Sequence, residues 1–262
     1  MKITTEEINR IIKEDLIELL KYRIIYKYSS FDVAVNNILT EQTLKFVNPS
    51  TFNDPFDCNE HTIKIDIDDE FIPQILRESN PKIYKEFEQN ILSKLKLPET
   101  WAESFRTRKE EYKVSCFSKK NNNVLMWSHY AEKHKGICVG FDFPHKVDEI
   151  FILSNVKYLN QITPVCGKAM FEKVILYWLT TKSSVWQYED EVRAFLQEKG
   201  DEKIITFDKK YIKEVVFGCN VSNQKIEDTL KKLKKTNLDI NLINFRRAII
   251  DKNSFKLELI HI

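Results

Sequence analysis

The spacing of apolar residues along this chain switches between a helical and an alternating period, which indicates a mixture of helices and strands. Residues 5–20 carry apolar side chains such as Ile8, Ile12 and Leu19 at helical spacing and predict an amphipathic helix. Further helices are predicted at 31–39, 124–131, 171–179 and 223–235. Runs rich in β-branched and aromatic residues predict strands at 23–28, 44–47, 113–118, 136–141, 147–153, 155–158, 191–197, 203–207, 211–218, 240–245 and 255–260.

The order of these elements sets the expected fold. Helices and strands follow one another without a regular β-α repeat, so we expect an α+β fold with a mixed, largely antiparallel sheet core and flanking helices. Residues 1–22 are predicted to form an N-terminal docking helix on a single domain that spans 23–262. Residues 67–108 are charged, interrupted by prolines and helical in spacing, which predicts an inserted helical segment that covers the core.

Composition restricts the cellular setting more than the function. The 41 lysines and arginines nearly balance the 39 aspartates and glutamates, so no overall charge points to nucleic acid. The 5 cysteines form no C-x-x-C pair, which suits reduced thiols and disfavours a structural zinc. No apolar run reaches the ~18 residues that a membrane span needs, and the N-terminus does not resemble a signal peptide. We therefore expect a soluble, cytoplasmic protein without a membrane partner.

The residues suited to chemistry are concentrated in four short segments. They combine hydrogen-bonding groups with large aromatic side chains, a combination that packing alone rarely requires. We expect these segments to assemble into one site. They are 52–57 (FNDPFD), 115–118 (SCFS), 126–142 and 186–193 (WQYEDEVR).

The first segment has two interpretations. Asn53 and Asp54 precede Pro55, which restricts the backbone of the residue before it, and their side chains can bond nearby amides as in a turn. The same groups, together with Asp57, could instead line a pocket.

His129 lies between Ser128 and Tyr130 on a predicted helix. A histidine in such a position can be a hydrogen-bonded structural residue. Near neutral pH it can also orient a ribose or act as a general base, so it is a candidate catalytic residue.

Glu189, Glu191 and Arg193 alternate along the chain. In an extended strand their side chains point to one face of the sheet, whereas Asp190 points to the other. One interpretation is an ion-pair ladder on a solvated sheet. The other is that a glutamate of this row stabilises a cationic transition state or activates a nucleophile.

Together the segments resemble a widespread bacterial family of unknown function, domain of unknown function 2971. The resemblance extends over roughly 23–218 and implies no established activity. The motifs that carry it are Tyr26-Lys27-Tyr28, FNDPFD at 52–57, Cys116-Phe117-Ser118, MWSHYA at 126–131, KGICVGFD at 135–142 and W-x-YE-x-E-x-R at 186–193.

A second similarity is to ADP-ribosyltransferase-like toxins and abortive-infection proteins. It implies an NAD-dependent ADP-ribosyltransferase or an NAD-hydrolysing protein in bacterial anti-phage defence, with NAD held in one cleft. The residues that it assigns are Arg23 or Lys27 for the phosphates, Ser115, Ser118, Trp127 and Tyr130 for the nicotinamide pocket, and Glu189 and Glu191 for the ribosyl cation. If Glu191 is catalytic, Glu191→Gln is expected to abolish activity and leave the fold intact, because the change is nearly isosteric.

Two other classes of function stay open. A metal-dependent nuclease or hydrolase would gather Asp54, Asp57, His129 and the glutamates around a divalent cation, but no tight ligand spacing is present and we assign no metal ligand. A non-catalytic sensing or interaction module would use the same groups to recognise a small molecule. A small-molecule nucleotide is the partner that the residues suggest, and they do not identify a protein or nucleic-acid target.

Overall fold

The computed structural model describes residues 3–66, 93–95, 97–144, 146–147, 151–166, 171–200 and 202–262. Most of the predicted inserted segment, from 67 to 92, lies outside the described residues. The α-helices in the described part are α1 (Thr5–Lys21), α4 (Pro98–Lys109), α5 (Val124–Tyr130), α6 (Phe171–Leu179) and α7 (Asn223–Leu233). A π-type helix η1 (Val33–Thr40) and short 3-10 turns accompany them: η2 (Pro49–Thr51), η3 (Glu60–Thr62), η4 (Ser184–Glu189), η5 (Lys209–Tyr211) and η6 (Ile240–Leu242).

The strands follow most of the predicted β-rich runs. They are β1 (Ile25–Ser29), β2 (Thr43–Val47), β3 (Ile65–Asp66), β4 (Tyr112–Ser118), β5 (Ile137–Phe141), β6 (Lys146–Val147), β7 (Phe151–Asn155), β8 (Lys157–Leu159), β9 (Val165–Cys166), β10 (Thr181–Ser183), β11 (Glu191–Gln197), β12 (Glu202–Thr206), β13 (Ile212–Phe217), β14 (Asn244–Ile250) and β15 (Leu257–His261).

Eleven of these strands, within the part of the chain that the structure describes, form one sheet. Nine lie in the order β15-β14-β13-β5-β1-β4-β11-β7-β6, while β2 pairs with β4 and β12 pairs with β2. Neighbours in this sheet run antiparallel, except that β13 and β14 run parallel. This mixed, mostly antiparallel sheet with its flanking helices confirms the expected α+β fold class.

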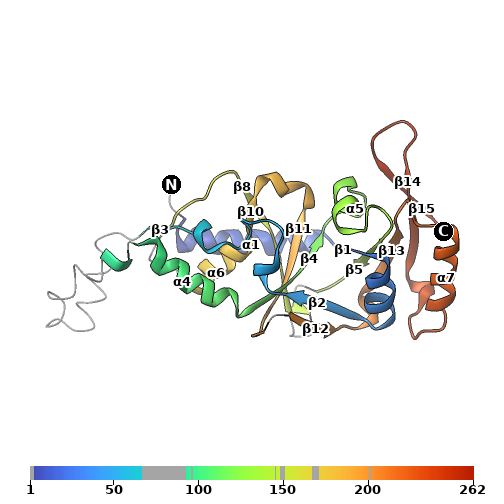
Figure 1. Cartoon of the computed structure of the whole chain (residues 1–262), viewed down its shortest axis with the longest axis horizontal. Helices are drawn as coiled ribbons and strands as arrows, with labels where there is room; N and C mark the ends of the chain where they lie inside the picture. The colour runs from blue at the N-terminus through green and yellow to red at the C-terminus, as the bar shows by residue number, and fades with distance from the viewer. Residues whose placement is uncertain are drawn as a thin grey trace.

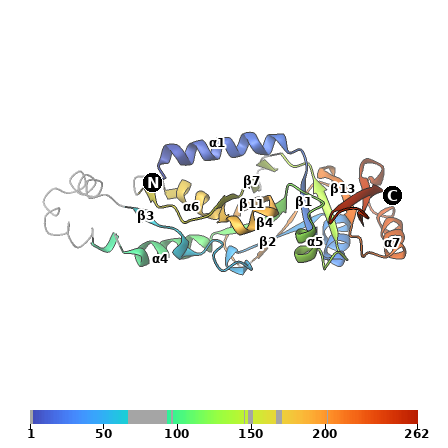
Figure 2. The ribbon, with the colours of Figure 1, turned by 90° about the horizontal axis from the view of Figure 1, so that it is seen from above.

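The molecule is elongated, with β14, β15 and α7 at one end and α4 at the other (Figure 1). α1 runs along one side of the sheet and α5 lies on the opposite side (Figure 2). Thr4 caps α1 by accepting from the amide of Glu7, whose side chain accepts from the Thr4 amide in return. The buried Ile8 and Leu19 secure this helix to the protein interior. Among the described residues, no helix is long and apolar enough to cross a membrane.

The sheet divides at β4, and this division positions the candidate site. β11 pairs with β4 along all seven residues from Tyr112 to Ser118, so it occupies one edge of that strand. β1 and β2 must share the other edge: β1 meets it at Ser118 and β2 at Val114. Between these two points no described strand pairs with that edge, and the ammonium of Lys27 donates to the carbonyl oxygen of Cys116 there (2.9 Å).

Two predicted elements differ from the structure. The strand expected at 240–245 is a 3-10 turn, Ile240–Leu242, because the side chain of Asp239 accepts from the amide of Asn241 and initiates a turn. β14 therefore begins only at Asn244. The helix expected at 31–39 takes the wider π form over Val33–Thr40.

α5 is fixed at its start and along its buried face. The Asn123 side chain caps the helix by accepting from the amides of Leu125 and Met126, and its own amide group donates to the carbonyl of Tyr188 (2.6 Å). Trp127 is 0 % exposed, its ring meets Tyr28 edge to face at 5.2 Å, and its indole N–H donates to the carbonyl of Asn121. α5 is thus held against β1 and η4, which places Tyr130 next to the charged groups described below.

We predict that Trp127→Ala lowers the free energy of unfolding by about 3–5 kcal/mol, because it leaves a large cavity and an unpaired carbonyl. Urea denaturation measures the change. Leu125→Ala, at an exposed position of the same helix, is the matched control and should change stability by less than about 1 kcal/mol. Equal effects of the two substitutions would contradict a core role for Trp127.

Candidate functional site

Five charged side chains are buried together where β10, η4 and β11 meet the loop that follows η2. They are Asp57, Lys182, Glu189, Glu191 and Arg193, and each is at most 7 % exposed. Moving unpaired charges out of water costs several kcal/mol each, so such a set is stable only when its members neutralise one another.

Arg193 joins three separate parts of the chain through this network. Its Nε donates to Glu191 Oε1 at 2.9 Å and its Nη2 to Asp57 Oδ2 at 2.5 Å. Its Nη1 donates to the carbonyl of Leu179 at the end of α6 (2.6 Å). The ring of Phe52 lies 5.1 Å from the guanidinium carbon. The 52–57 loop, α6 and β11 are therefore connected by one buried cation.

Lys182 is surrounded by the carboxylates. Its Nζ lies 2.6 Å from Glu189 Oε2, 3.1 Å from Glu191 Oε2 and 3.5 Å from Asp57 Oδ2. Burial alone would lower the pKa of Lys182, but the nearby carboxylates, Glu191 foremost, raise it above its ordinary value. The ammonium consequently stays protonated and holds the three acids together.

Glu191 is ionised for the same reason. Burial would raise its pKa, but Arg193 and then Lys182 outweigh burial and lower the pKa to about 2. Replacing Glu191 would remove an ion-pair partner from both Arg193 and Lys182, and replacing either cation would leave the buried carboxylates with a single cation between them.

The turn at Asp190 brings the two glutamates to one cation. Glu189 ends the 3-10 turn η4, Asp190 adopts a left-handed conformation with φ 42°, and Glu191 starts β11. The sequence predicted that Glu189, Glu191 and Arg193 lie on one face of an extended strand. This is confirmed for Glu191 and Arg193, whereas Glu189 lies in the preceding turn. The interpretation as an ion-pair ladder on a solvated sheet is also wrong, because all three side chains are buried.

A cavity of about 310 Å³ lies directly above this network. Glu189 and Glu191 form part of its floor, and the division of the sheet at β4 supplies Lys27 and Cys116. Its walls are mostly aromatic and apolar, and they come from β1, the loop after η2, β4 and α5. The wall residues include Tyr26, Phe52, Phe117 and Met126.

Lys27 is the cation of the cavity that forms no direct ion pair with the described carboxylates. Its Nζ donates to Ser115 Oγ and to the Cys116 carbonyl oxygen, both at 2.9 Å, and lies 5.2 Å from the Phe117 ring centre. No salt bridge between Lys27 and a described acidic residue occurs within 4.0 Å. Burial lowers the pKa of Lys27, so an anion bound beside it would favour its charged form.

Tyr130 links α5 to the network. Its hydroxyl donates to Glu189 Oε1 at 2.6 Å, while Lys182 occupies the other oxygen of that carboxylate. Burial, followed by this hydrogen bond, raises the pKa of Tyr130, so the phenol stays a proton donor. Glu189 is thereby held in one orientation at the cavity floor.

The structure brings most of the predicted site residues together. Glu189, Glu191, Lys27, Tyr130 and Asn53 line the cavity. Two serines lie behind them: Ser115 accepts from Lys27, and the buried Ser118 donates to the backbone carbonyl of Glu189 at 2.6 Å.

Four predicted residues lie elsewhere. His129 and Arg23 are exposed and do not line the cavity. Trp127 is buried in the packing between α5 and β1, so it is not available for stacking on a ligand. Asp54 is buried, and its carboxylate accepts from the Phe56 amide at 2.9 Å. This contact agrees with the interpretation of Asp54 as a turn-forming residue.

The sequence reasoning missed Lys182. This residue lies in β10 within Thr181-Lys182-Ser183, and neither its type nor its neighbours mark it as part of a site. The sequence held one weak indication: Asp57, Glu189 and Glu191 were expected in one site, with Arg193 as the only basic residue of their two segments. A balancing second cation was therefore to be expected.

The acids of this site are already paired with protein cations. The ammonium of Lys182 takes the central position between Asp57, Glu189 and Glu191 that a divalent cation would otherwise occupy. Within the part of the chain that the structure describes, no group of three or more His, Cys, Asp or Glu residues is arranged to hold a metal ion.

Residues 126–194 match the model of a family described as "Protein of unknown function (DUF2971)". The match confirms the resemblance to this family over a segment that runs from α5 into β11 and includes Tyr130, Lys182, Glu189, Glu191 and Arg193. No curated protein and no solved structure matches the chain. The similarity to ADP-ribosyltransferases stays a prediction.

The expectation that Glu191→Gln leaves the fold intact does not agree with this geometry. A folded-state pKa of about 2, against ~4.3 when unfolded, corresponds to stabilisation on the order of 3 kcal/mol. Because the folded pKa is depressed, this contribution is complete above about pH 5 and is lost as the pH falls toward 2.

We therefore predict that Glu191→Gln reduces the free energy of unfolding at pH 7 by about 3 kcal/mol and that its difference from wild type shrinks toward pH 2. Chemical denaturation at several pH values measures it. Glu258→Gln, at an exposed position of β15, is the control and should differ little from wild type throughout. A wild-type advantage that does not change with pH would argue against the ion pairs.

Proposed function

We propose that this protein binds a nicotinamide dinucleotide of the NAD⁺ type in the cavity above the charge network and cleaves its bond between nicotinamide and ribose. The observation that carries the proposal is the meeting of a cation, a carboxylate and aromatic walls in one cavity. The cation is complementary to a phosphate of the substrate, the carboxylate to the ribose hydroxyls, and the aromatic walls to the flat nicotinamide ring.

Lys27 is the group suited to the phosphate. It donates two hydrogen bonds to described protein atoms, whereas an ammonium can donate three. It forms no salt bridge within 4.0 Å with a described carboxylate, although the charge of Glu191 acts on it from farther away, so a phosphate oxygen would gain a charge-assisted hydrogen bond. Arg23, the other residue proposed for this role, is exposed and outside the cavity.

The nicotinamide ring would lie against the aromatic walls. Tyr26 and Phe52 provide partly exposed rings, and the exposed Asn53 adds an amide that can pair with the nicotinamide carboxamide. The cavity volume of about 310 Å³ is at the lower end of the ~300–1,000 Å³ usual for ligand pockets. We therefore expect it to enclose the nicotinamide, its ribose and the adjoining phosphate, and to leave the adenosine part of the dinucleotide outside.

Glu189 is the carboxylate best placed for chemistry. Tyr130 and Lys182 fix it at the cavity floor, where it can accept a hydrogen bond from a ribose hydroxyl and stabilise positive charge that develops on the ribose. The bond from ribose C1′ to the ring nitrogen breaks, and nicotinamide leaves with the bonding electrons. Water then adds to C1′ and releases a proton; in a transferase, a nucleophile of a target takes the place of water.

A specific observation favours a second candidate, a binding module without catalysis. Both glutamates are tied to cations and are only 3 % exposed, an arrangement that suits holding a pocket in shape as well as reacting with a ligand. A metal-dependent hydrolase fits the site less well, because Lys182 already neutralises its acids. A role in anti-phage defence stays a prediction.

Calorimetric titration with NAD⁺ and a parallel assay for released nicotinamide test the proposal. Lys27→Met should weaken binding by at least ~10-fold, since it removes one charge-assisted hydrogen bond. The matched control is Lys45→Met, at an exposed position of the adjacent strand β2, which should bind as wild type does. Glu189→Gln should bind NAD⁺ within a few fold of wild type but release nicotinamide ~10²–10³-fold more slowly.

Glu189→Gln is a cleaner test than Glu191→Gln, because Lys182 keeps Asp57 and Glu191 as partners when the Glu189 charge is removed. Binding without release in the wild-type protein would favour the binding module. Absence of binding by a correctly folded wild-type protein would contradict both.

A further inference from the structure

A second pocket, of about 250 Å³, lies on the other side of Lys182 from the cavity described above. It is formed by η3, by the chain that follows β8, by α6 and by β10. The 52–57 loop and its continuation separate the two: Phe52, Asn53 and Asp57 line the first cavity, whereas Phe56 and Ile63 line the second. Nothing in the proposed function uses this second pocket.

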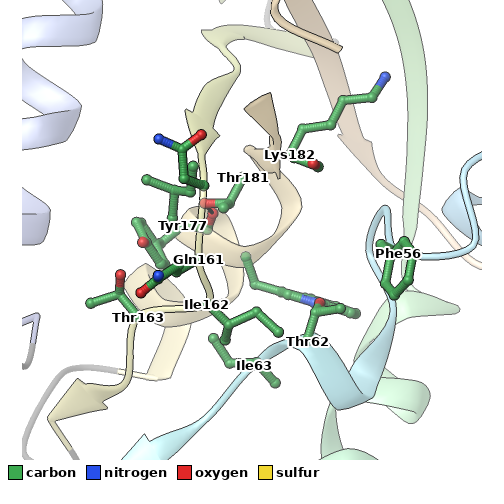
Figure 3. A pocket seen from close by; sticks show the side chains of 13 residues that line it. Phe56, Thr62, Ile63, Gln161, Ile162, Thr163, Tyr177, Thr181 and Lys182 are labelled. Carbon is green, nitrogen blue, oxygen red and sulfur yellow. Dashed lines mark hydrogen bonds between the residues drawn. The ribbon is translucent and has the colours of Figure 1, made fainter. Parts of the chain in front are cut away.

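The pocket has apolar surfaces and no free charge. Ile63, Leu159 and Trp178 provide apolar surface at its walls, and Phe56 and Ile162 lie at its exposed rim. Among the residues that the structure describes, Lys182 is the one charged side chain that lines it. Figure 3 shows this side chain extending away from the other labelled residues. Its ammonium pairs with Glu189, Glu191 and Asp57. A charged ligand would therefore be desolvated here without a partner, so the pocket suits a neutral molecule.

Tyr177 supplies an unused polar group. Tyr177 is 5 % exposed and lines the pocket. Its hydroxyl interacts weakly with the Thr181 side chain but makes no hydrogen bond of normal geometry to a described residue. Thr181 donates its own proton to the Tyr177 carbonyl oxygen at 2.6 Å. A buried hydroxyl without a partner is unfavourable, and a ligand that offers an acceptor would relieve this cost.

The other polar groups at the base of the pocket are largely engaged. The indole N–H of Trp178 donates to the carbonyl of Asn59 at 3.0 Å, and the Thr62 hydroxyl donates to the same carbonyl at 2.6 Å. The exposed ring of Phe56, the exposed Ile162 side chain and the exposed amide of Gln161 remain available to a ligand. These features favour a flat, apolar ring that carries hydrogen-bond acceptors.

The volume limits the size of the ligand. An apolar protein cavity of about 150 Å³ holds benzene, and pockets for drug-sized molecules begin near 300 Å³. A pocket of about 250 Å³ therefore matches one ring or two fused rings.

We propose that this pocket is a second ligand site, which binds a neutral heteroaromatic molecule of nucleobase size against the exposed Phe56 and Ile162 side chains, with the Tyr177 hydroxyl donating to a ring nitrogen or carbonyl. The two sites differ in chemistry, because charged side chains line the first cavity whereas the second pocket suits a neutral ligand. Lys182 belongs to the wall of both, so the two sites are structurally adjacent.

Titration of the full chain with adenine, followed by calorimetry, tests the proposal. Adenine is neutral at pH 7.5, has two fused rings and offers several acceptor nitrogens. Tyr177→Phe should weaken adenine binding about tenfold, since it removes one hydrogen bond. Its melting temperature should be unchanged or raised, because the lost hydroxyl has no protein partner; a merely structural tyrosine would instead lower it.

Ile162→Trp fills the exposed rim and should abolish adenine binding, whereas Ile260→Trp, at a similarly exposed position on β15, should leave it unchanged. Lys27→Met should also leave it unchanged. Failure of wild type to bind adenine, unaltered binding by Ile162→Trp, or loss of binding by Lys27→Met would each overturn the second site. Wild-type affinity in Tyr177→Phe would overturn the role of the hydroxyl. None of these outcomes depends on whether NAD⁺ binds the first cavity.

Discussion

The need to neutralise buried charge organises this protein around Arg193 and Lys182. Three carboxylates, from Asp57, Glu189 and Glu191, face these two cations, and all five side chains are nearly inaccessible to water. Because the energetic cost of any unpaired member is large, the segments that carry them can adopt only arrangements that keep the set together. The network thus fixes the relative positions of a loop, a short strand, a 3-10 turn and a long central strand.

The pairing of strands around β4 opens the sheet next to this charge network. β11 occupies one edge of β4 completely, while β1 and β2 divide the other edge, and Lys27 donates to the carbonyl of Cys116 where neither strand pairs with it. A cavity opens above this division, with the charge network as its floor. A rigid, charged floor below aromatic walls gives a binding pocket that needs no large rearrangement to form. The neutral pocket beyond Lys182 uses the other surface of the same framework.

The sequence was sufficient to predict the fold class and most of the candidate site. The strand periods located β1, β4 and β11, and the clustered motifs correctly indicated that distant segments meet, because polar groups beside aromatics have few structural uses. The predictions that were wrong or missing concern residues whose positions depend on contacts between distant parts of the chain. Trp127 was predicted to stack on a ligand, but α5 packs with this side chain toward the core. Lys182 was not predicted because the residues next to it in the sequence do not indicate a site. The left-handed Asp190, which turns Glu189 toward the same cation as Glu191, follows from tertiary contacts and not from alternation.

The charges of Asp57 and Arg193 stabilise each other and tie the 52–57 loop to the sheet. A double-mutant cycle with Asp57→Asn and Arg193→Met, measured by urea denaturation, tests this mutual stabilisation most directly. We predict a coupling free energy of at least ~1.5 kcal/mol, with the double variant less destabilised than the sum of the two single variants. Additive effects of the two substitutions would contradict the account.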